Sequence, residues 1–137
     1  METANKNCEA ITTEGKTTPL SIFVDGAGCR PDGSGSAFAW LCTTTKEQAI
    51  ERISGLTNNQ AEYRAFIAAL TALPERSQAE LFSDSQVLCC QLSGQYKVND
   101  LQLAELLTQA QSLIKDKKLT VTLRWVPRAR NLAGKLL

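Results

Sequence analysis

Three short apolar stretches near the start of the chain predict strands. Leu20–Val24 is a β-branched and aromatic run, Ser36–Cys42 alternates well enough to predict a second strand, and Gln48–Ile53 favours a third. The segment from Gly26 to Gly35 contains the glycine and proline that are typical of turns. Three such strands with short connections predict an antiparallel meander.

The hydrophobic period changes after this meander. From Asn59 to Leu73 apolar residues recur at helical spacing, and Pro74 stops the helix. The rest of the chain predicts a strand at Glu80–Ser83, a short helix at Ser85–Leu92, a helix at Leu101–Ile114 and a strand at Leu119–Val126. The order βββαβαβ, with the short helix as an addition, predicts an α/β fold. We expect a mixed five-stranded sheet, with three antiparallel and two parallel strands, flanked by helices.

The chain divides into a polar start and one domain. Residues 1–18 are rich in Thr, Asn, Glu and Lys without periodicity, which predicts a mobile leader, and residues 19–137 are long enough for one domain with a core. No apolar run reaches the roughly 18–20 residues that cross a bilayer. The polar start also lacks the apolar segment of a signal peptide. We therefore expect a cytoplasmic protein.

Composition restricts the possible catalytic chemistry but does not indicate a nucleic-acid partner. The formal net charge is +1, so bulk charge does not favour nucleic-acid binding, and local arrangement must carry any such case. The sequence has no histidine, which excludes Ser–His–Asp and Cys–His catalysis in their usual forms. A general base would have to be a carboxylate, a lysine or a metal-activated water.

Three carboxylates fall where a shared site is expected. Asp25 follows the first predicted strand and Asp84 follows the fourth. If these strands are parallel neighbours, as the strand–helix–strand order favours, both aspartates lie beyond the same edge of the sheet. Glu62 shares the helical face of Phe66 and Ala69, where a carboxylate is costly unless it is paired or bound to metal. Three converging carboxylates favour Mg²⁺ or a similar hard cation, and two such ions can cleave a phosphodiester without histidine.

Each acid also has a purely structural interpretation. Asp25 with Gly26 is a turn signal. Asn59 and Glu62 have the spacing of a capping box. Asp84 could cap the short helix that follows it. Their joint placement favours one metal site over three separate coincidences.

Four short motifs stand out along the chain. They are Phe23–Gly26 (FVDG), Thr57–Tyr63 (TNNQAEY), Ser83–Gln86 (SDSQ) and Trp125–Arg128 (WVPR). With these motifs in this order, the chain from Leu20 to Leu137 resembles the ribonuclease H type 1 family, and TNNQAEY is the most specific of the four. The resemblance implies an endonuclease that hydrolyses the RNA strand of RNA–DNA hybrids to 5′-phosphate and 3′-hydroxyl ends. It also implies two Mg²⁺ or Mn²⁺ ions when substrate is bound.

The resemblance also implies roles for individual residues. Asp25, Glu62 and Asp84 match the metal ligands. The positions that match substrate contacts are Gly26, Thr57, Asn58, Asn59, Gln60 and Gln86. Thr57 matches a site near a DNA phosphate, and the amides match minor-groove contacts, since an amide both donates and accepts hydrogen bonds. Helix capping is an alternative role for Asn58 or Asn59.

The segment Gln91–Val98 (QLSGQYKV) resembles the compact family members of archaea and some bacteria, which lack a basic helical protrusion. Lys97 is a candidate phosphate contact in this form, and hybrid binding should depend on few charges. Arg128 is a candidate contact to the scissile phosphate, although a guanidinium cannot act as a base near neutral pH. Residues 27–33 depart from the family's pattern, which puts the backbone contacts to RNA in that turn in question.

The largest departure concerns a fourth acid. The family usually places an aspartate shortly after VPR, but no Asp or Glu lies between Asp116 and Leu137. Alignment puts Gly134 or Lys135 at that place. Asn131 is the nearby side chain with an oxygen that could bind a metal, so we predict a D-E-D-N site with Asn131 as its fourth member.

Two other functions are compatible with these residues. The protein could bind hybrids without cleaving them, or it could be a nuclease of the same fold with another nucleic acid as substrate. The three retained acids argue against the first and the TNNQ segment against the second. Nothing in the sequence requires a protein partner, so we expect a monomer.

Overall fold

The computed structural model describes residues 19–137, so the predicted leader lies outside the described residues. The strands are β1 (Leu20–Ala27), β2 (Ala37–Cys42), β3 (Gln48–Arg52), β4 (Gln78–Ser83) and β5 (Thr120–Trp125). The helices are α1 (Asn58–Ala72), α2 (Gln86–Ser93) and α3 (Leu101–Asp116), followed by two 3₁₀ turns, η1 (Arg128–Arg130) and η2 (Leu132–Leu136). Every strand and helix expected from the sequence is present, and the two 3₁₀ turns were not foreseen.

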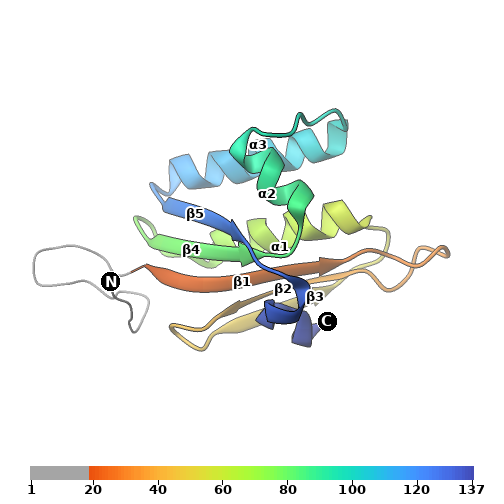
Figure 1. The fold of residues 1–137 in the computed structure, drawn as a ribbon, viewed down its shortest axis with the longest axis horizontal. Coiled ribbons are helices and arrows are strands. Elements are labelled where there is room, and N and C mark those ends of the chain that lie inside the picture. The colour runs from red at the N-terminus through yellow and green to blue at the C-terminus, as the bar shows by residue number, and fades with distance from the viewer. Residues whose placement is uncertain (1–18) are drawn as a thin grey trace, which may run out of the picture.

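All five strands belong to one sheet with the order β3-β2-β1-β4-β5. The strands β1, β2 and β3 pair antiparallel, whereas β4 lies parallel to both β1 and β5 (Figure 1). This confirms the mixed sheet predicted from the sequence. It also makes β1 and β4 parallel neighbours, which the convergence of Asp25 and Asp84 requires.

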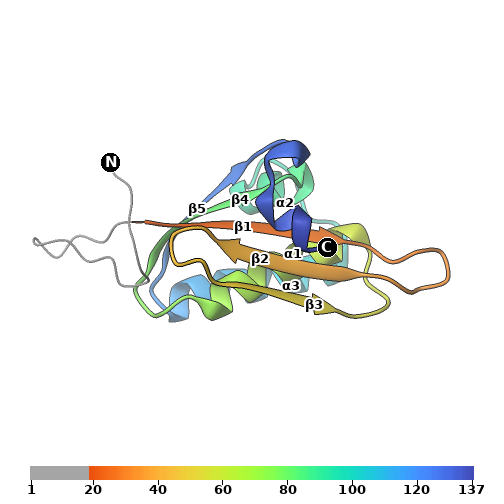
Figure 2. The same cartoon turned by 90° about the horizontal axis from the view of Figure 1, so that it is seen from below.

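Helices α1 and α3 lie on one face of the sheet, and the C-terminal segment (residues 128–137) covers the opposite face. Helix α1 packs on β1 and β2, and α3 packs on α1. Figure 2 shows the turn η2 on the other side of β1 and β2. The core lies between α1 and the sheet, where Val24, Phe66 and Leu81 are fully buried. The sheet and α1 therefore form a rigid base, and the C-terminal segment closes over its open face.

A capping box fixes the start of α1. The Thr57 hydroxyl accepts a hydrogen bond from the Gln60 N–H at 3.1 Å, and the Gln60 side chain accepts one from the Thr57 N–H at 2.9 Å. The capping box considered for Asn59 and Glu62 is therefore wrong, because it sits two residues too late. Since Glu62 is not needed for capping, its carboxylate is free for another role.

No helix among the described residues has the length and apolar content that crossing a membrane requires.

Candidate metal centre

The three carboxylates predicted to converge do so. Asp25, Glu62 and Asp84 each present an oxygen within 4.8 Å of the others. Asp25 comes from the end of β1, Glu62 from the second turn of α1, and Asp84 directly follows β4. Two structural alternatives are wrong: Asp25 pairs with Ala39 inside β1 rather than forming a turn, and Ser85, not Asp84, caps α2.

Glycine at position 26 lets α1 approach β1 closely enough to deliver Glu62. A Cβ on Gly26 would overlap the backbone of Ala61. The Gly26 N–H donates to Glu62 Oε1 at 3.1 Å and to Asp25 Oδ1 at 3.0 Å. One backbone amide thus holds two of the three carboxylates in place. The Gly26 N–H therefore points into the carboxylate cluster.

The acids repel one another in a partly water-free setting. Glu62 is only 8% exposed, and burial, followed by the charges of Asp25 and Asp84, raises its pKa to about 9. Burial and the Asp84 charge raise the pKa of Asp25 to about 6, while the charge of Arg128 acts in the opposite direction on both. A divalent cation would relieve this repulsion. The all-oxygen donor set suits Mg²⁺ or Mn²⁺.

Two side chains position Asp84, one from the last residue of β5 and one from the segment that follows β5. The indole Nε1 of Trp125 donates to the Asp84 backbone carbonyl at 3.2 Å, and Asn131 Nδ2 donates to Asp84 Oδ2 at 3.3 Å. Sequence reasoning missed the role of Trp125, although the WVPR motif that contains it was the available signal. These contacts tie β5 and the C-terminal segment to the carboxylate cluster.

Asn131 lies beside the acids, but its amide is already engaged. It is 4% exposed, and its Nδ2 also donates to the Val24 carbonyl at 2.9 Å. Its Oδ1 accepts the N–H of Ala133 at 3.2 Å and so caps η2. The structure thus brings Asn131 to the site, with its nitrogen rather than its oxygen turned toward Asp84. Its role as a fourth ligand stays a prediction, and these hydrogen bonds argue against it.

The TNNQ segment forms the first turn of α1 next to the cluster. Thr57 caps the helix, so neither Asn58 nor Asn59 has that role. The side-chain oxygen of Asn58 accepts the Gly28 N–H at 2.7 Å. Asn58 therefore keeps its amide nitrogen for donation. The Gln60 amide nitrogen contacts Gln102 at the start of α3. Thr57 and Gln60 thus fix the first turn of α1. Asn58 is exposed on this turn, and Asn59 is half-exposed.

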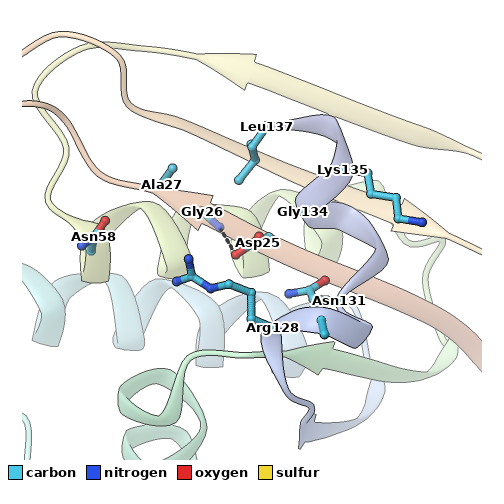
Figure 3. Close-up of a pocket in the computed structure, with 10 residues that line it drawn as sticks. Asp25, Gly26, Ala27, Asn58, Arg128, Asn131, Gly134, Lys135 and Leu137 are labelled. Atoms are coloured by element: carbon cyan, nitrogen blue, oxygen red, sulfur yellow. Dashed lines mark hydrogen bonds between the residues drawn. The ribbon is translucent and has the colours of Figure 1, made fainter.

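The other predicted substrate contacts lie at the surface. Gln86 is exposed at the first position of α2, and Lys97 is exposed between α2 and α3. Arg128 is exposed at the start of η1 and lines a cleft of about 510 Å³ beside Asp25. Figure 3 shows its guanidinium extending past Asp25 in the direction of Asn58, whereas Lys135 points away. The lining residues are Asp25, Gly26, Ala27, Asn58, Arg128, Ala129, Asn131, Gly134, Lys135 and Leu137.

Comparison with known proteins agrees with this architecture. The family model described as RNase H matches residues 17–132. The chain belongs to the RNase H family. Ribonuclease HI of Halobacterium salinarum is 34% identical over 121 residues, which cover 82% of this chain and 58% of that protein. The bifunctional protein Rv2228c of Mycobacterium tuberculosis is 36% identical over 105 residues, which cover 74% of this chain but only 28% of the relative's length.

Solved structures of RNase H proteins share the fold. The N-terminal RNase H domain of Rv2228c has a TM-score of 0.75 at 32% identity, covering 86% of this chain and 89% of that one. RNase H1 from the halophilic archaeon Halobacterium salinarum has a TM-score of 0.76 at 31% identity, covering 86% and 93%. LC11-RNase H1, solved in complex with RNA/DNA hybrid, has a TM-score of 0.77 at 26% identity, covering 85% and 92%.

Proposed function

We propose that this protein is a ribonuclease H that hydrolyses the RNA strand of RNA–DNA hybrids, leaving 5′-phosphate and 3′-hydroxyl ends. The observation that carries the proposal is the convergence of Asp25, Glu62 and Asp84 within 4.8 Å beside the TNNQ turn. We propose these three acids as the ligands of Mg²⁺ or Mn²⁺. When bound, such ions supply Lewis-acid stabilisation of the charge that develops on the phosphate.

The residues around the acids are suited to a hybrid duplex. We propose contacts from Gly26, Thr57, Asn58, Asn59, Gln60, Gln86, Lys97 and Arg128. The free amide nitrogen of Asn58 can donate to the acceptors that bases and 2′-hydroxyls display in a minor groove. The complex of LC11-RNase H1 with RNA/DNA hybrid supports this substrate class. We also propose that the protein acts as a monomer in the cytoplasm.

The electrostatics couple substrate binding to the metal. Ionised carboxylates repel a phosphodiester, and the charge of Arg128 opposes theirs. The cluster therefore admits a phosphate only when cations compensate it. Because the sequence has no histidine, no imidazole carries protons in this reaction.

A strand-specific cleavage assay tests the proposal. A hybrid labelled on RNA in one sample and on DNA in another is incubated with the protein in Mg²⁺ or Mn²⁺. We expect cleavage of RNA alone, with no cleavage when Asp84 is replaced by Asn. DNA cleavage would overturn the substrate assignment.

A hybrid-binding module without catalysis is the second candidate. The absence of any acidic residue between Asp116 and Leu137 favours it, since the C-terminal segment adds no carboxylate to the cluster. Retention of the hybrid on the protein, with no cleavage in either metal, would support this candidate instead.

A further inference from the structure

The loop between α2 and α3, residues 94–100, carries the exposed Lys97 and is held at both ends (Figure 1). It begins at Gly94, which ends α2 with a φ of +88°, and it finishes at Asp100, whose side chain caps α3. Between these two caps the Tyr96 N–H donates to the Cys90 carbonyl at 3.1 Å. A short loop with fixed ends and an internal anchor has little conformational freedom.

Gln91 joins this loop to helix α1. Its side-chain oxygen accepts the Tyr63 hydroxyl at 2.8 Å, and its amide nitrogen donates to the Lys97 carbonyl at 3.4 Å. A glutamine suits this place because it accepts on one atom and donates from the other. Tyr63 is fully buried in the core, so its hydroxyl is a fixed point. Gln91 therefore fixes the Lys97 backbone relative to α1.

A second link joins the other end of the loop to the same helix. Gln102, in the first turn of α3, accepts a hydrogen bond from the Gln60 amide nitrogen. Gln60 and Tyr63 lie one turn apart on α1, and residues at that spacing share a helix face. The residues on either side of the loop thus both contact one face of α1.

Helix α1 also carries Glu62 and the TNNQ turn. Because Glu62 is next to Tyr63 in the chain, one helical turn holds both a member of the carboxylate cluster and the anchor of the loop. A phosphate contact made by Lys97 would therefore lie at a fixed distance from the cluster. Preorganisation of this kind lowers the ordering cost of binding a ligand.

We propose that Gln91 is a positioning residue for hybrid binding, which acts through Lys97 by tying the loop 94–100 to Tyr63. The inference deepens the proposed function and rests on it, because it requires that Lys97 contacts a phosphate of the hybrid. Gln91 takes no part in the chemistry. It affects how tightly the duplex is held rather than how fast the bound RNA is cleaved.

Binding of a 2′-O-methyl RNA–DNA duplex, which resists cleavage, measures the contribution of Gln91. Gln91→Met keeps the length of the side chain and removes both of its hydrogen bonds. We expect the affinity in Mg²⁺ to fall about 2–5-fold, in line with the modest net effect of a hydrogen bond, and by no more than Lys97→Ala causes. The KM for cleavage of an ordinary hybrid should rise by the same factor, with kcat unchanged. Unchanged affinity, or a fall in kcat at constant KM, would overturn the proposal.

A double-mutant cycle shows whether Gln91 acts through Lys97. In the Lys97→Ala background, Gln91→Met should cause no further loss of affinity, because the contact that Gln91 positions is already gone. Equal losses in the two backgrounds, or a Lys97→Ala variant that binds like the wild type, would overturn the proposal.

Ser93→Ala is the matched control. It removes the hydrogen bond from the Ser93 hydroxyl to the Cys90 carbonyl, at the same end of α2, and leaves both Gln91 contacts in place. Its affinity should equal that of the wild type. A loss as large as that of Gln91→Met would show that general loosening of α2 explains the effect, against the proposal.

Tyr63→Phe provides a second variant in case circular dichroism shows that Gln91→Met does not fold. It removes only the hydroxyl that anchors Gln91, so the affinity should fall, again without further loss in the Lys97→Ala background. A folded Tyr63→Phe variant with wild-type affinity would overturn the proposal.

The strand-specific cleavage assay separates failure of this inference from failure of the proposed function. RNA cleavage together with additive losses from Gln91→Met and Lys97→Ala removes this inference alone. Coupled losses of duplex affinity without RNA cleavage remove the proposed cleavage and retain Gln91 as a positioning residue.

Discussion

The carboxylate cluster and the C-terminal segment, residues 128–137, share one cleft but are built in different ways. The acids stand on regular elements: β1 and β4 are locked in parallel register, and α1 is pressed onto β1 at Gly26. The segment consists of two 3₁₀ turns, anchored by buried Asn131 and Ala133. Sites on strands and helices hold geometry more closely than sites on loops. The acids therefore determine the chemistry of the site, whereas the segment adjusts the position of Asp84.

The two regions also differ in charge. The cluster gathers three acids, one of them almost fully buried, whereas the segment contributes Arg128, Arg130 and Lys135 and no acid. Like charges that are buried together need a cation. The segment touches the cluster through the hydrogen bond from Asn131 to Asp84 and acts on Asp25 and Glu62 through the charge of Arg128. Substitutions in the cluster should therefore have larger effects on turnover than those in the segment.

Replacing Asp84 by Asn should have the largest effect. The variant removes one charge from the metal site and should lower turnover by more than about 10³-fold, since a metal ion supplies several kcal/mol of transition-state stabilisation. Single-turnover cleavage of a hybrid measures the rate. Far-ultraviolet circular dichroism should match the wild type; a well-folded variant that keeps its activity would refute the site assignment.

Replacing Gly26 by Ala should come next. The added methyl group overlaps the Ala61 backbone, so α1 must move away from β1 and carry Glu62 with it. We expect a loss of about 1–3 kcal/mol in the free energy of unfolding from overpacking. A displacement near 1 Å also lowers the rate by about 10²-fold. Urea denaturation and cleavage rates measure both.

Gly134→Ala is the matched control for Gly26→Ala. Its methyl group meets only the Asp25 carboxylate, which can rotate. The unfolding free energy should stay within about 0.5 kcal/mol of the wild type. Equal destabilisation by both variants would show that the two regions do not differ in rigidity as described.

Replacing Asn131 by Ala should have an intermediate effect. The variant loses the donors to the Val24 carbonyl and to Asp84, so the segment loosens and Asp84 is held by Trp125 alone among the contacts described above. We expect the rate to fall at least about tenfold, in line with the 10–100-fold cost of losing residues that support a metal ligand. An unchanged rate would mean that Asp84 does not depend on this segment.

Replacing Lys97 by Ala should have the smallest effect. If Lys97 contacts one phosphate, hybrid affinity falls a few-fold, and the slope of log affinity against log salt decreases by about one. Lys115→Ala provides the comparison, because Lys115 lies at the far end of α3, roughly 20 Å along its axis from Leu101. Fluorescence anisotropy at several salt concentrations distinguishes the two. Equal slopes for all three proteins would remove Lys97 from the interface.

The sequence predicts the cluster well because its determinants are local. The order of elements makes β1 and β4 parallel neighbours, and Glu62 follows from helical spacing on α1. The extension of β1 through Asp25 and Gly26 was harder to predict, since pairing with β2 overrides the turn preference of that dipeptide. The capping box was misplaced because Thr57 with Gln60 and Asn59 with Glu62 have the same three-residue spacing.

The C-terminal segment could not be predicted to the same degree. Two 3₁₀ turns have no hydrophobic period to detect, and the roles of Asn131 and Gly134 depend on contacts with residues over 100 positions away. Composition indicates an oxygen donor at 131, but only the structure shows that this oxygen faces Ala133. The sequence likewise does not show that Gly134 matters, because its position against Asp25 is visible only in the structure.

Anomalous diffraction from a crystal soaked in Mn²⁺ tests the central claim most directly. The account predicts one strong peak about 2.0–2.2 Å from oxygens of Asp25, Glu62 and Asp84, the distance expected for a small divalent ion. It predicts no comparable peak at Asn131 Oδ1. A well-ordered crystal without a peak between the three carboxylates would contradict the claim that they form the metal centre.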